Sequence, residues 1–201
     1  MIRTIIFDLG KVIVPFDLKR GYEALRPHCP YPAEEIPRRI SSTDLVTRFE
    51  SGEVSPEEFV ERLSRLLGLC VDYDRFCELW SSIFLPHTLL PEPFLAALHS
   101  RYRLLLLSNT NAIHFAMIRE RYSLLGHFDD YILSYKVGAM KPSERIYKEA
   151  IGRAQCPAAE CFFTDDIPLY VEGARAAGMD AVVFESAGQI ERELKARGVE
   201  W

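Results

Sequence analysis

The chain has 201 residues, a length that favours one domain or one domain carrying an insertion. Apolar residues make up 48% and charged residues 26% of it, which excludes disordered, collagen-like and coiled-coil chains. The formal net charge of −5 disfavours nonspecific binding to nucleic acid, but a small phosphorylated ligand needs only local positive charge.

Cysteine spacing and hydropathy predict the compartment. The five cysteines are odd in number, widely spaced and without a CxxC pair, which is typical of reduced thiols. Asp8 interrupts the short apolar run at the N-terminus, so we expect no signal peptide there. The apolar stretch at Leu104–Leu107 is far shorter than the roughly 20 residues of a membrane helix. We expect a cytoplasmic protein, monomeric or homodimeric, with no membrane or nucleic-acid partner.

The first predicted element is a buried strand at residues 2–7, which is rich in β-branched and aromatic residues and stops at Asp8-Leu9-Gly10. From Phe16 to about Leu90 no strand-like run follows. Ser55-Pro56-Glu57-Glu58 instead predicts a capping box with proline at the first helical position. We therefore expect a helical insertion beside the carboxyl end of the first strand. Its helical patterns lie at residues 45–51, 55–67 and 74–84.

The remainder of the chain alternates between strand and helix patterns. We expect Ser143 to cap one helix, and Gly178 to follow the end of the next. Apolar strands that alternate with helices indicate a parallel sheet covered on both faces. The predicted fold class is therefore α/β, a Rossmann-like three-layer sandwich of about five strands with an inserted helical part. The later strands are expected at 102–107, 131–134, 161–164 and 181–184, and the helices at 112–122, 143–154, 169–177 and 189–197.

Polar residues follow the predicted strands at the points where they end. In an open α/β sheet, ligands bind outside the carboxyl ends of the strands. Three carboxylates and one ammonium there leave a charge of −2, which a divalent cation would neutralise. Oxygen ligands at this density suit Mg²⁺. The residues are Asp8, Ser108-Asn109-Thr110, Lys141 and Asp165-Asp166.

Four segments carry these residues in a specific order: FDLGKVIV with Asp8, LLLSNT with Ser108, GAMKP with Lys141, and FFTDD with Asp165 and Asp166. They resemble the four ordered motifs of the haloacid dehalogenase-like (HAD) hydrolases. The position of the insertion matches the helical cap of that superfamily. The resemblance implies a core of residues 1–15 and 90–201 and a cap of residues 16–89. Within the superfamily, the chain is similar to small bacterial phosphatases that have a DLG first motif and act on sugar phosphates.

The resemblance implies a catalytic role for three side chains. Asp8 is expected to be the nucleophile and to form an aspartyl-phosphate that water hydrolyses. Ser108 and the backbone N–H of Asn109 are expected to hold the phosphoryl oxygens. Lys141 is expected to neutralise charge on the nucleophile and on the phosphoryl group.

The resemblance also implies a Mg²⁺ site. Its expected ligands are the carboxylates of Asp8 and Asp166 and the backbone carbonyl of Gly10, with Asp165 contributing through water. The implied function is a Mg²⁺-dependent phosphatase, a phosphoric monoester hydrolase acting on a small phosphorylated metabolite of the sugar-phosphate kind.

Two positions depart from the motifs. Most phosphatases of the superfamily have a second Asp, a general acid, where this chain has Gly10. General acid catalysis is typically worth roughly 10²–10⁴-fold in rate, so the rate and the range of leaving groups are expected to differ. Tyr170 stands where related sequences often have Asn, which predicts different surroundings for Lys141 or the acids.

Other interpretations remain open at this point. Taken singly, each residue has a structural explanation: a helix cap for Asp8 or Ser108-Asn109-Thr110, a solvated side chain for Lys141, and a turn for Asp165-Asp166. Gly10 and Tyr170 leave room for a catalytically degraded member that acts as a binding or regulatory protein. A 2-haloacid dehalogenase is the third alternative, which the paired acids and Gly10 fit badly.

Overall fold

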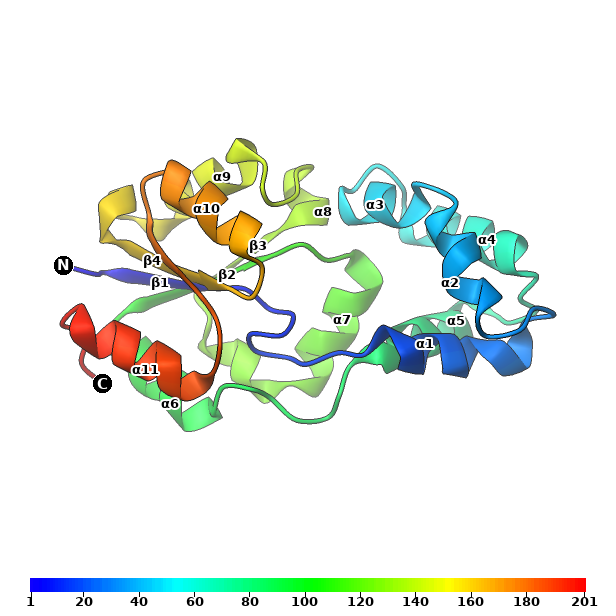
Figure 1. The fold of residues 1–201 in the computed structure, drawn as a ribbon, viewed down its shortest axis with the longest axis horizontal. Coiled ribbons are helices and arrows are strands. Elements are labelled where there is room, and N and C mark those ends of the chain that lie inside the picture. Colours follow the sequence, from blue (N-terminus) through cyan, green and yellow to red (C-terminus); the bar gives the residue numbers. More distant parts are fainter.

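The computed structural model describes residues 1–201 and contains one five-stranded, fully parallel sheet with the strand order β3-β2-β1-β4-β5 (Figure 1). β1 lies in its centre, where Thr4 pairs with Arg103 of β2 on one side and with Cys161 of β4 on the other. The predicted parallel α/β sheet is confirmed. The strands are β1 (Thr4–Phe7), β2 (Arg103–Ser108), β3 (Asp130–Leu133), β4 (Cys161–Asp165) and β5 (Asp180–Val183).

Helices cover both faces of the sheet because successive strand residues point to opposite sides. Ile5 and Phe7 pack into a cluster with α6, α7 and α11, whereas Ile6 packs on the other face with α9 and α10. The result is the predicted three-layer sandwich (Figure 1). The helices are α6 (Glu92–His99), α7 (Ala112–Arg121) and α11 (Ala187–Ala196) on the first face, α9 (Glu144–Ala154) and α10 (Pro168–Ala176) on the second, and the short α8 (Ser134–Val137) after β3.

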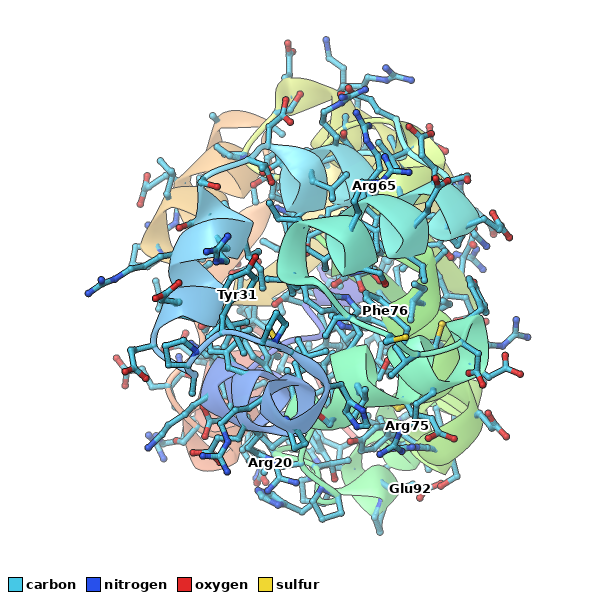
Figure 2. The ribbon with its side chains drawn as sticks, turned by 90° about the vertical axis from the view of Figure 1, so that its right-hand side faces the viewer. Arg20, Tyr31, Arg65, Arg75, Phe76 and Glu92 are labelled. Atoms are coloured by element: carbon cyan, nitrogen blue, oxygen red, sulfur yellow. The ribbon has the colours of Figure 1, made fainter.

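A separate group of helices, which we call the helical unit, lies between β1 and β2 in the sequence. It extends beyond the carboxyl ends of the strands, on the right in Figure 1. It has its own apolar cluster, in which the rings of Phe49 and Phe59 stack with centroids 4.1 Å apart. Figure 2 looks onto this group and shows Phe76 among the helices and Arg75 toward the outside. It comprises α1 (Leu18–Leu25), α2 (Glu35–Ser41), α3 (Leu45–Glu50), α4 (Pro56–Leu67), α5 (Tyr73–Trp80) and the 3-10 turns Arg26–His28 and Ser81–Ile83.

Some local predictions needed correction. The helices α1, α2 and α6 were not predicted, although Asp17 caps α1 through the N–H of Lys19. The capping box of α4 forms only in part, because Ser55 accepts the N–H of Glu58 but the Glu58 carboxylate pairs with Arg62. Ser143 stands at the start of α9 without a side-chain cap bond.

No helix is long and apolar enough to cross a membrane.

Phe59→Ala should lower the free energy of unfolding by about 3–5 kcal/mol, because the ring is fully buried and the mutation opens a cavity in the helical unit. Urea denaturation measures this change. Leu169, which is 61% exposed, provides the control, and Leu169→Ala should change stability by less than about 0.5 kcal/mol. Equal effects of the two substitutions would contradict the packing described here.

Candidate active site

The carboxyl ends of β1, β2 and β4 bring the predicted side chains to one edge of the sheet. Asp8 follows β1 directly, Ser108 ends β2, and Asp165 ends β4. Because β1 pairs with both neighbours in parallel, Asp8 stands level with Asp165, and Ser108 lies one residue farther along β2. Lys141 reaches them from the segment between α8 and α9.

The Lys141 ammonium group lies between two carboxylates. Its Nζ atom is 2.7 Å from Oδ1 of Asp8 and 2.5 Å from Oδ2 of Asp165, and it also donates to the Leu107 carbonyl at 3.0 Å. All three charged side chains are buried. Burial by itself disfavours the ammonium form, but the two carboxylates outweigh it and raise the pKa of Lys141. Lys141 is therefore a buried partner of two acids and not a solvated lysine.

Three carboxylates are close enough to share a cation. Asp8, Asp165 and Asp166 each present an oxygen, and these oxygens lie within 4.8 Å of one another. With Lys141 counted, the group carries −2 when all three acids are ionised. An all-oxygen donor set of this charge fits Mg²⁺. The Gly10 carbonyl accepts none of the backbone hydrogen bonds of its turn, so it is available as a further ligand.

The two neighbouring acids of the fourth motif differ in their surroundings. Asp165 is completely buried, and its two oxygens accept from Lys141 and from the backbone N–H of Ile167. Asp166 is only partly buried, and burial followed by the Asp165 charge raises its pKa. Asp166 is thus the freer of the two carboxylates for a direct metal contact.

Burial also sets the acidity of Asp8. It raises the pKa of Asp8 to about 7, against the lowering effect of Lys141 and with a further rise from Asp165. The carboxylate of Asp8 therefore depends on nearby positive charge to stay ionised, and a cation shared with Asp166 would add to that charge.

The second motif positions Lys141 through the side chain of Asn109. Oδ1 of Asn109 accepts the N–H of Lys141 at 2.8 Å, and Nδ2 donates to the Lys141 carbonyl at 3.0 Å. This two-bond contact fixes the segment that carries Lys141. The motif does not cap the following helix, because Asn111 takes that position and accepts the N–H of His114. The positioning role of the Asn109 side chain was not predicted, because a motif alone gives no signal for a contact between a side chain and a backbone segment distant in sequence.

Tyr170 takes part in the surroundings of Lys141, as its departure from the motif suggested. Its ring centroid lies 5.2 Å from Nζ of Lys141, and its hydroxyl accepts a weak hydrogen bond from Asn109 at 3.4 Å. The Tyr147 hydroxyl in turn donates to the Tyr170 carbonyl.

The Phe16 ring fills part of the space beside Gly10. A β-carbon added to Gly10 would lie 2.9 Å from Cε1 of Phe16, so any larger residue requires the Phe16 ring to move. Phe16 therefore fills the place of the usual second Asp. Asp17 and His28 are titratable residues that could replace that acid, but neither lines the cavity at this site.

A cavity of about 340 Å³ opens beside Ser108 and Asn109, between the sheet edge and the helical unit. Its size suits a small organic molecule. Its lining consists of Leu9, Gly10, Phe16, Leu18, Gly21, Tyr22, Leu25, Ile40, Val46, Glu50, Trp80, Ile83, Phe84, Ser108, Asn109, Thr110 and His114.

Known proteins are similar to this chain in sequence and in fold. The family model described as haloacid dehalogenase-like hydrolase matches residues 2–178. D-ribitol-5-phosphate phosphatase of Bacteroides thetaiotaomicron is 26% identical, over 96% of this chain and 97% of that protein. Phosphatase MT3486 of Mycobacterium tuberculosis is 30% identical, over 98% and 95%.

A solved structure agrees with these matches. A HAD family enzyme from Bacteroides thetaiotaomicron, crystallised as a magnesium complex, superimposes with a TM-score of 0.80 and 25% identity, covering 93% of this chain and 94% of that one. The family match spans most of the chain and includes all four motifs. The chain therefore belongs to the haloacid dehalogenase-like hydrolases.

Proposed function

We propose that this protein is a Mg²⁺-dependent phosphatase that hydrolyses a small phosphorylated metabolite through an aspartyl-phosphate on Asp8. The observation that carries the proposal is the placement of Lys141 between Asp8 and Asp165, with Asp166 alongside. An organic-sized cavity adjoins this group, because Leu9 and Gly10, which directly follow Asp8, line it together with Ser108. The two relatives named as phosphatases support it, and one of them is named for D-ribitol 5-phosphate. Sugar phosphates are accordingly the first substrates to test.

The chemistry proceeds in two displacements. An Asp8 carboxylate oxygen attacks phosphorus, the bond from phosphorus to the leaving oxygen breaks, and the leaving oxygen departs as an alkoxide that takes a proton from solvent water. Water then attacks the aspartyl-phosphate, which releases inorganic phosphate and restores the carboxylate. Ser108 and the Asn109 N–H bind the phosphoryl oxygens, and Lys141 offsets the negative charge that gathers around Asp8.

Mg²⁺ would supply charge neutralisation between Asp8 and the phosphoryl group. Asp8, Asp166 and the Gly10 carbonyl would hold it, with Asp165 acting through water. We further propose that residues 16–89 form the cap over this site and that residues 1–15 and 90–201 form the core. The cavity supports this division, because side chains of the helical unit provide much of its lining.

Two other functions fit these observations less well. Three carboxylates within 4.8 Å of one another suit a metal-dependent reaction better than metal-free dehalogenation. The absence of an acidic side chain at position 10 favours a catalytically degraded binding protein. Against this, Lys141 contacts Asp8, and the three acids that would bind the metal lie close together. Phosphate release measured with and without Mg²⁺ separates the three functions.

Asp8→Asn should reduce phosphatase activity by about 10³-fold or more, because the amide is nearly isosteric but cannot act as the nucleophile. The measurement is phosphate release at saturating Mg²⁺, with circular dichroism to confirm the fold. Asp74→Asn makes the same change on an exposed part of the helical unit and should keep full activity. Retention of most of the activity in Asp8→Asn would show that another group attacks phosphorus.

Asp166→Ala should raise the Mg²⁺ concentration for half-maximal activity by about 10–100-fold, because it removes the freer carboxylate. Asp165→Ala should raise it less, since Asp165 already binds Lys141 and the Ile167 N–H. The check is a Mg²⁺ titration of all three proteins. Full activity of the native enzyme in excess chelator would contradict the metal site.

The kcat/KM of the native enzyme should fall steeply as the pKa of the leaving group rises, because no acid at position 10 protonates the leaving oxygen. Aryl, acyl and anomeric sugar phosphates should react faster than primary alkyl phosphates. The measurement is log kcat/KM against leaving-group pKa, under conditions where chemistry limits the rate.

The matched variant for this series is Gly10→Asp combined with Phe16→Leu, which makes room for the new side chain. This variant should make log kcat/KM depend less on leaving-group pKa and should raise kcat/KM most for poor leaving groups. Phe16→Leu alone is the control. A flat line for the native enzyme would show that an acid is already present.

A further inference from the structure

The wall of the cavity contributed by the helical unit is almost entirely apolar. Glu50, at the end of α3, is the one carboxylate among the residues that line the cavity. The other side chains from this unit are aliphatic or aromatic, and Tyr22 supplies the one hydroxyl. A leaving group in this cavity would therefore meet apolar surface along most of its length and a single acid.

Glu50 has no partner within the protein. Neither a hydrogen bond nor an ion pair joins the Glu50 carboxylate to another residue. Burial is the sole cause that raises the pKa of this group, to about 7. The nearby Arg48 pairs with Glu53 instead, at 3.2 Å. Glu50 is only partly buried and its carboxylate oxygens are not enclosed, so they are accessible from the cavity to a ligand that donates a hydrogen bond.

The backbone holds Glu50 at the seam between the helical unit and the sheet. Just after α3, Gly52 has φ +77°, and a β-carbon there would lie only 2.1 Å from the Tyr135 carbonyl oxygen. This close approach brings the end of α3 against α8, as Figure 1 also shows. Glu50 is therefore placed by a contact with the core and does not extend from a free loop.

His114 faces the same cavity but is already satisfied. One ring nitrogen, Nδ1, lies 3.1 Å from the Asn111 amide, and Nε2 lies 3.2 Å from the Trp80 carbonyl. Burial lowers the pKa of His114 to about 4, so the ring is neutral near pH 7 and does not offset the Glu50 charge. A cationic or hydroxyl-bearing ligand remains as the partner for Glu50.

We propose that Glu50 selects the leaving group by accepting a hydrogen bond from an amine or hydroxyl at its far end. The substrate class is then a phosphate monoester of an aromatic or aliphatic alcohol that has one such terminal donor. This inference rests on the proposed phosphatase function and narrows it. A polyol phosphate fits less well, because hydroxyls along its middle would lie against apolar walls and lose their hydrogen bonds to water.

Three aryl phosphates with similar leaving-group pKa values isolate the effect of the terminal group: 4-ethylphenyl, 4-(2-hydroxyethyl)phenyl and 4-(2-aminoethyl)phenyl phosphate. The native enzyme should favour at least one of the two donors over the ethyl compound by about 10-fold or more in kcat/KM. Glu50→Gln should lose most of that preference while hydrolysing the ethyl compound at a rate within about twofold of native. Glu57→Gln, which removes the same charge from an exposed position on α4, should behave as native.

Each result has a distinct meaning. Equal kcat/KM for the three compounds, or an equal loss on all three in Glu50→Gln, would overturn the role of Glu50 and leave the phosphatase function standing. Absence of turnover on every phosphate ester would overturn the phosphatase function. In that event, isothermal titration with 4-(2-aminoethyl)phenol, 4-(2-hydroxyethyl)phenol and 4-ethylphenol still tests Glu50. Tighter binding of a phenol that has a terminal donor, lost in Glu50→Gln, would support the role of Glu50. Equal binding of the three phenols would contradict that role.

Discussion

The buried ammonium of Lys141, held between Asp8 and Asp165, is the interaction on which the rest of the site depends. Removing one partner of a buried ion pair typically costs about 3–5 kcal/mol, because it leaves a charge without compensation. The contact therefore ties the ends of β1 and β4 to the segment before α9. It also leaves the acidic cluster with an excess of negative charge, which is the electrostatic reason for a divalent cation at this edge.

The parallel sheet supplies the geometry for that contact. β1 lies between β2 and β4, so the three motif-bearing strands end side by side. Asn109 adds the remaining constraint by bonding both backbone groups of Lys141. Residues more than 130 positions apart, Asp8 and Lys141, thereby come within hydrogen-bond distance without any contribution from the helical unit.

The helical unit supplies much of the wall of the cavity beside the charged site. Phe16 occupies space next to Gly10 and adds apolar surface to the cavity there. Glu50 brings a single carboxyl to an otherwise apolar wall. The chain thus has glycine at position 10 and a single carboxyl, that of Glu50, in the lining of the adjoining cavity.

The sequence alone determined the strands, the later helices and the motif residues, because each is a local signal: an apolar run, a helical period, or a polar residue at a strand end. It missed α1, α2 and α6, whose patterns are short and whose helical state depends on packing against neighbours. Only the tertiary structure decided the role of the Asn109 side chain, the crowding beside Gly10 and the position of Glu50. Each of these rests on contacts between segments distant in the chain, such as Gly52 against Tyr135, and no local pattern of residues encodes such a distance.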